Sequence, residues 1–217
     1  VSLQSAIVGD HTAAAMGIRG LTSWLRENGA EVANMTVLPS DALLLIDGNG
    51  LAFHLLKSLS WSATLGGYTE IDVATRAFFG KLLRAGLEPA VYLDGRATRL
   101  KSATISSRRR GRADVWEALQ VACLDGRVVS KDELPEPGLV LEQVLASIRA
   151  LRIRIVQCEG EADLEMARAC SMFVTRGWSA FILAADSDFL LHADVHYVPF
   201  DELVLSGGGD DAAASVM

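Results

Sequence analysis

Four apolar segments of the chain end directly in acidic residues, and this recurring arrangement constrains the fold more than any other feature. Short apolar runs bounded by turn residues are typical of buried strands. The runs cover residues 42–46, 89–93, 153–158 and 181–185. The acids that follow them are Asp47, Asp94, Glu159, Glu161, Asp186 and Asp188. Segments with apolar residues at helical spacing, such as 71–87 and 138–151, lie between the runs. This alternation predicts an α/β fold with a mainly parallel central sheet and helices on both faces.

These acids are predicted to form one site, because ligands of parallel α/β folds bind beyond the carboxyl ends of the strands. The alternative is that each acid is a turn residue or a helix N-cap, which is common for aspartate. That alternative suffices for a single aspartate, but a site accounts better for acids after four separate strands. Clustered carboxylates repel one another unless a cation neutralises them. Oxygen ligands favour Mg²⁺ or Mn²⁺ over zinc. Two such ions can activate a water and stabilise a leaving oxygen in phosphodiester hydrolysis.

The distribution of charge along the chain is more informative about binding partners than the net charge of −7. Between Gly95 and Ala113 the chain carries seven basic residues and no acid. They are Arg96, Arg99, Lys101, Arg108, Arg109, Arg110 and Arg112. Such a segment beside a metal site would hold phosphates, although a solvated basic loop is the usual role of a charge run. Residues alone therefore predict a metal-dependent phosphoryl hydrolase that acts on a polyanion.

The remaining composition predicts an intracellular protein with one main domain. The three cysteines form no CxxC pair, which suggests a reducing compartment. No apolar run reaches the ~20 residues of a membrane span, and no secretory leader pattern is present. His192 and His196 are four positions apart but fall in a predicted loop and strand, so they are not predicted metal ligands.

Three segments are expected along the chain. Residues 1–15 form an unpatterned extension, residues 16–205 form the main domain, and residues 206–217 form a disordered, low-complexity tail. The first residue is Val, so we expect a fragment or an upstream extension.

Five motifs, in order, resemble those of the flap endonuclease/XPG family, and most closely its Asteroid branch. They are Met16–Leu21, Leu45–Gly48, Tyr92–Gly95, Glu159–Ala162 and Asp186–Asp188. The resemblance covers roughly residues 16–205 and implies a PIN-like three-layer sandwich with helices on both faces. It also implies two-metal hydrolysis of flapped or branched DNA, a role in DNA repair, and a nuclear or cytoplasmic location.

The resemblance also implies roles for individual residues. The six strand-end acids would bind Mg²⁺ or Mn²⁺. Lys101 and Arg108, seven and fourteen positions after Asp94, would steer the scissile phosphate. Phe53, six positions after Asp47, would stack on a base, although a lone aromatic on a helix is equally a core residue. The other nucleic-acid-binding residues would be Arg96, Arg99, Arg109, Arg110 and Arg112.

Two departures from the family pattern leave a second hypothesis open. The family motif opens at the first residue of its members, whereas Met16 is internal here. The family also carries a further Asp in a Gly-x-Asp context, which Asp210 and Asp211 do not match. The alternative to an active nuclease is thus a catalytically idle PIN-like module that binds nucleic acid or a protein. Asp163 could extend the metal site, but an acid in a helix first turn is the other reading.

Overall fold

A five-stranded parallel sheet forms the centre of the molecule. The computed structural model describes residues 21, 24, 27, 36–59, 67–96, 102–130, 134, 137–192, 194–205 and 214–216. The sheet contains β2 (Leu43–Asp47), β3 (Glu88–Leu93), β4 (Arg154–Gln157), β5 (Ala180–Ala184) and β6 (Tyr197–Pro199). Their order is β4-β3-β2-β5-β6, and every neighbouring pair is parallel. The predicted mainly parallel sheet is confirmed.

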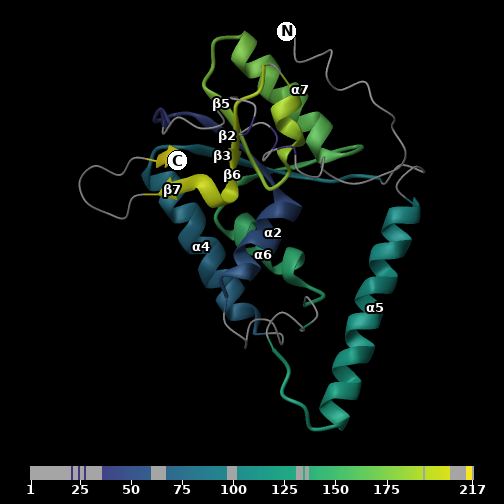
Figure 1. Cartoon of the computed structure of the whole chain (residues 1–217). Helices are drawn as coiled ribbons and strands as arrows, with labels where there is room; N and C mark the ends of the chain where they lie inside the picture. The colour runs from purple at the N-terminus through teal and green to yellow at the C-terminus, as the bar shows by residue number, and fades with distance from the viewer. Residues whose placement is uncertain are drawn as a thin grey trace.

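Helices cover both faces of this sheet (Figure 1). On one face lie α2 (Gly48–Lys57), α4 (Tyr68–Arg84) and α6 (Val140–Ala150), and on the other lies α7 (Ala162–Thr175). Side chains alternate along β2, so Leu44 and Ile46 join the core beneath the first group while Leu45 joins the core beneath α7. Because the sheet is buried on both sides, its strands are nearly continuous apolar runs. The predicted three-layer sandwich is therefore confirmed.

A second, antiparallel sheet has the strand order β1-β8-β7. It contains β1 (Thr36–Val37), β7 (Leu203–Leu205) and β8 (Ala214–Val216). Within the expected tail, β8 pairs with β7 along its three residues and with β1 through Ser215 and Val216. Composition could not reveal this pairing, since β1 lies far away from β8 in sequence. Residues 1–15, 206–213 and 217 lie outside the described residues.

The basic segment forms part of a long helix, α5 (Ser102–Leu124), which stands apart from the sheet and its covering helices (Figure 1). The solvated loop that is the usual form of a charge run is therefore not what the described part of this segment adopts, since it is helical from Ser102 onward. Arginine and alanine are good helix formers, and no proline interrupts residues 102–113. Residues 102–113 carry no apolar stripe, and a helix is recognised from sequence by such a stripe. Neither α5 nor any other helix among the described residues combines the length and the apolar character needed to cross a membrane.

Candidate functional site

The strand order places the acids at a switch point of the sheet. The chain runs outward from β2 to β3 and β4, then crosses to β5 and β6 on the other side of β2. Parallel sheets bind ligands at such a reversal, beyond the carboxyl ends of the strands. Asp47 is the last residue of β2, and Asp186 follows the neighbouring β5 by two positions. The two acids therefore follow the two neighbouring strands at which the strand order reverses.

Asp47 links the sheet to the first covering helix. Its carboxylate caps α2 by accepting a hydrogen bond from the backbone N–H of Asn49 at 3.0 Å. Burial raises the pKa of Asp47, and the negative charges of Asp94 and Asp186 push it the same way, while the backbone N–H groups of Asn49 and Gly50 oppose the rise. Asp94 and Asp186, which follow the strands on either side of β2, thus both lie within electrostatic reach of Asp47. This approach of two acids to the buried Asp47 is the central feature of the site.

Asn49 holds Asp94 in place, a role that no sequence pattern indicated. Its side-chain Nδ2 donates to Asp94 Oδ2 at 2.9 Å, while the backbone N–H of Ala162 donates to Asp94 Oδ1 at 2.8 Å. Asn49 therefore contacts both Asp47 and Asp94. Each carboxylate oxygen has two lone pairs, so Asp94 keeps the capacity to accept a further ligand. The sequence does contain a signal for the contact between Asn49 and Asp47, because an Asn two positions after an Asp favours a local Asx turn.

The loop after β4 is tied to the loop after β3 by backbone hydrogen bonds. The N–H of Gly95 donates to the carbonyl of Gly160 at 2.7 Å, and the N–H of Arg96 donates to the carbonyl of Glu159 at 3.0 Å. The side chain of Gln157 donates to the carbonyl of Asp94 at 2.7 Å. A Cβ at position 95 would lie only 2.6 Å from the carbonyl carbon and oxygen of Glu159. Glycine is therefore required where these loops meet.

The remaining predicted acids lie at the same edge of the sheet. Glu161 is the N-cap residue of α7, and Asp163 lies in the first turn of that helix, as the helix-dipole reading predicts. Asp186 caps the short helix η4 (Ser187–Leu191) by accepting from the N–H of Asp188 at 3.0 Å. Among the described side chains, however, no three His, Cys, Asp or Glu groups are gathered tightly enough to hold an ion as they stand. Assignment of the six acids as metal ligands therefore stays a prediction.

The structure describes some of the predicted substrate-binding residues and not others. Phe53 projects from α2 with 48% of its surface exposed, so it is not a core residue. Arg96 is exposed beside the site, and Arg110 and Arg112 are exposed on α5. The backbone of α5 also includes Arg108 and Arg109. Arg99 and Lys101 lie outside the described residues.

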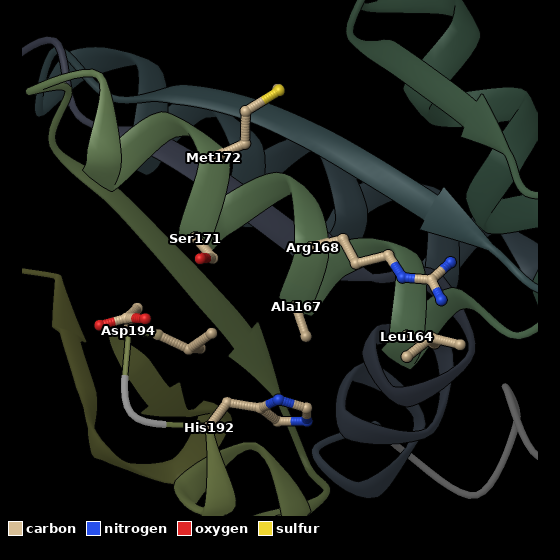
Figure 2. Close-up of a pocket in the computed structure, with 8 residues that line it drawn as sticks. Leu164, Ala167, Arg168, Ser171, Met172, His192 and Asp194 are labelled. Carbon is tan, nitrogen blue, oxygen red and sulfur yellow. The ribbon is translucent and has the colours of Figure 1, made fainter.

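A separate cavity of about 390 Å³ lies between α7 and the residues after η4 (Figure 2). Leu164, Ala167 and Ser171 follow one another along α7, and His192 and Asp194 lie across from them (Figure 2). None of the six predicted ligands lines this cavity. It is therefore distinct from the carboxylate edge.

Comparison with known proteins identifies the class. No protein-family model matches the chain. The chain is 29% identical over 198 residues to Protein asteroid of Drosophila melanogaster, covering 88% of this chain and 21% of that protein. It is 30% identical over 179 residues to human Single-strand DNA endonuclease ASTE1, covering 81% of this chain and 24% of that protein. The chain thus spans about a fifth to a quarter of the length of these curated relatives.

The fold agrees with that of a solved protein–DNA complex. The catalytic core of Rad2 in complex with a DNA substrate superposes with a TM-score of 0.54 at 14% identity, covering 92% of this chain and 55% of that one. The fold is that of a PIN-like α/β domain. The chain belongs to the flap endonuclease/XPG family of PIN-like nucleases, near its Asteroid branch. The resemblance stated from the motifs is confirmed.

Proposed function

We propose that the chain is the catalytic domain of a divalent-metal-dependent nuclease that hydrolyses phosphodiester bonds in flapped or branched DNA. The observation that carries this proposal is that Asp94 and Asp186 both act electrostatically on the buried Asp47 at the switch point of the sheet. A purely structural role gives no reason to bring three like charges together, since each raises the free energy of the others. The names of the relatives add support: one is called a single-strand DNA endonuclease.

The donor set suits Mg²⁺ or Mn²⁺, because it consists of carboxylate oxygens alone. Two ions would be held among Asp47, Asp94, Glu159, Glu161, Asp186 and Asp188. When bound, such ions activate a water and stabilise the leaving oxygen. Burial of Asp47 beside two other acids also fits, since a cation would offset both the lost hydration and the repulsion.

The chain's own residues would position the substrate around this centre. Asn49 orients the Asp94 carboxylate through its 2.9 Å hydrogen bond. Lys101 and Arg108 would hold the scissile phosphate, and the exposed ring of Phe53 is available to stack on a neighbouring base. Arg96, Arg99, Arg109, Arg110 and Arg112 would contact the strand's phosphates. We infer a nuclear or cytoplasmic site of action from the DNA substrate.

Cleavage assays with a double amide variant test the proposal. Labelled 5′-flap, 3′-flap, bubble, single-stranded and RNA substrates are incubated with the protein and Mg²⁺ or Mn²⁺. Asp186→Asn/Asp188→Asn keeps the side-chain shapes but removes two charges, so the rate should fall by several orders of magnitude while binding persists. The control is Glu88→Gln, an exposed acid at the opposite end of β3, which should leave the rate unchanged. Cleavage that survives the double change would place the chemistry elsewhere.

The alternative function is an idle PIN-like module that binds nucleic acid or a protein. One observation favours it: the described acids are not gathered tightly enough to hold an ion as they stand. Calorimetry with Mn²⁺ separates the two functions, because an ion that binds only the native state releases or absorbs heat and raises the melting temperature. Neither effect at millimolar Mn²⁺, with substrate binding intact and no cleavage, would establish the idle module.

A further inference from the structure

The loop between β4 and α7 carries two of the predicted metal ligands, Glu159 and Glu161. Strand β4 ends at Gln157 and helix α7 begins at Ala162, so both acids lie outside the regular elements. Glu159 is exposed, so packing of its side chain does not hold it in place. A metal ligand must nevertheless be oriented by its surroundings. The backbone contacts of this loop therefore decide where the Glu159 carboxylate lies.

Both backbone groups of Glu159 are hydrogen-bonded, one to each side of the loop. Its carbonyl accepts from the N–H of Arg96 at 3.0 Å, which joins the loop to the segment after β3. Its N–H donates to the side-chain Oε1 of Glu165 at 3.2 Å. Glu165 lies in the first turn of α7 and is partly buried. Helix α7 therefore holds Glu159 through a single side chain.

The ordinary role of an acid in a helix first turn does not account for this hydrogen bond. Such an acid interacts with the positive end of the helix dipole, and in a capping box it reaches back from the third helical residue to the N–H of the N-cap. Glu165 is the fourth residue of α7, and its partner lies two positions before the N-cap residue, Glu161. Its hydrogen bond therefore holds the loop that carries Glu159 rather than the end of the helix.

We propose that Glu165 is a positioning residue of the metal site, which fixes the Glu159 carboxylate by holding the Glu159 backbone N–H. The proposal rests on the proposed function, because it assigns Glu159 to the metal. The alternative is that Glu165 is itself a further ligand. Burial raises the pKa of Cys158 to about 11, and the nearby charge of Glu165 adds to this rise. Because Cys158 is buried in the core beneath α7, Glu165 acts on the inner side of the loop.

Three variants at position 165 separate the reach of the side chain from its charge. Calorimetry measures Mn²⁺ binding to each metal-free chain. Glu165→Ala removes the acceptor, so the affinity should fall by about 10–100-fold, the usual range for a residue that orients a metal ligand. Glu165→Gln keeps an oxygen acceptor at the same reach and should retain most of the affinity. Glu165→Asp keeps the charge but is shorter by one methylene, and it should lose as much affinity as Glu165→Ala.

The opposite order would overturn the proposal. If Glu165→Asp retained the affinity while Glu165→Gln lost it, Glu165 would act through its charge, as a ligand does. A fall in melting temperature for Glu165→Ala with unchanged Mn²⁺ affinity would reduce Glu165 to a structural residue. Glu142→Ala is the matched control, because Glu142 is an exposed acid in the first turn of α6, and it should leave the Mn²⁺ affinity unchanged.

A second measurement needs no metal. The amide hydrogen of Glu159 should exchange slowly in the original chain and in Glu165→Gln, and faster in Glu165→Ala and Glu165→Asp. Equal exchange in all four proteins would overturn the proposal. An original chain that shows this pattern but binds no Mn²⁺ would contradict the proposed function and leave the hold of Glu165 on Glu159 standing. Mn²⁺ binding that Glu165→Ala leaves unchanged would do the reverse.

Discussion

The carboxylate edge of the sheet and helix α5 both carry residues proposed to act on DNA, but they are held in opposite ways. At the edge, Asp94 is fixed by donors from Asn49 and Ala162 at 2.9 and 2.8 Å. Along α5, the side chains from 110 to 118 are exposed, and a Cβ at Gly111 would meet nothing within 4 Å. The edge is therefore ordered by the fold itself, whereas α5 is ordered mainly by its own backbone hydrogen bonds.

This difference matches what each region would have to do. Catalytic groups must be held close to their productive geometry, because small displacements cost large factors in rate. A helix that captures a polyanionic strand can tolerate more freedom, since charge attraction acts over several ångströms. Substitutions of the same kind should therefore have opposite effects in the two regions.

Gly95→Ala and Gly111→Ala should show the largest contrast. The added methyl at position 95 meets backbone atoms of Glu159, which cannot move without breaking the tie between the loops after β3 and β4. We expect a loss of about 1–3 kcal/mol in the free energy of unfolding, or failure to fold. The same change at Gly111 meets open space and should stabilise α5 by up to about 1 kcal/mol.

Thermal unfolding and hydrogen exchange along α5 check both outcomes. The melting temperature should fall for Gly95→Ala, by roughly 2–4 °C for each kcal/mol lost. Exchange within α5 should slow for Gly111→Ala. A Gly95→Ala protein as stable as the original chain would show that the loops after β3 and β4 are not tightly joined. The carboxylate edge would then not be more rigidly held than α5.

Asn49 gives the next largest effect, on rate rather than on stability. Asn49→Ala removes the donor to Asp94 but keeps the backbone N–H that Asp47 accepts from, so the cap of α2 survives. We expect cleavage to fall by about 10–100-fold, the usual range for a residue that orients a metal ligand. Single-turnover kinetics with saturating Mg²⁺ would measure the change.

Asn49→Asp separates this role from a merely structural one. Acids are favoured in the first turn of a helix, so a structural role predicts that Asp is tolerated at the second residue of α2. An orienting role predicts that Asn49→Asp cleaves more slowly than Asn49→Ala, because Asp replaces a donor to Asp94 with a repelling charge. Activity of Asn49→Asp above that of Asn49→Ala would contradict the orienting role.

The same contrast explains which features the sequence predicts and which it does not. The buried strands and the acids after them are local signals: a run such as Leu43–Asp47 carries both its burial and its charge in neighbouring residues. The role of Asn49 is not local, because its partner Asp94 is 45 residues away. The start of α5 at Ser102 was missed because an exposed helix has no apolar stripe to detect. Pairing of β8 with β1 joins residues 36–37 to residues 215–216, which no short pattern can reveal.

The smallest expected effect concerns the stability cost of the buried acid. The pKa of Asp47 is raised in the folded chain, first by burial and then by Asp94 and Asp186. A carboxyl with a raised native pKa lowers the stability of the fold at any pH above the unfolded value of 3.8, and this range includes neutral pH. Asp47→Asn retains an oxygen acceptor for the Asn49 N–H and removes the charge. Metal-free Asp47→Asn should therefore melt a few degrees above the original chain at pH 7.

The pH dependence of this gain identifies its cause. As pH falls through the native pKa, Asp47 becomes protonated in the fold, and the advantage of the amide should shrink. Below the unfolded value of 3.8 both states carry a neutral carboxyl, so the gain should vanish. Asp114→Asn, an exposed acid on α5, is the control and should change the free energy of unfolding by no more than about 0.5 kcal/mol at any pH. An equal gain from both substitutions would mean that net charge, rather than burial at the sheet edge, governs stability, and the two regions would then differ in exposure alone.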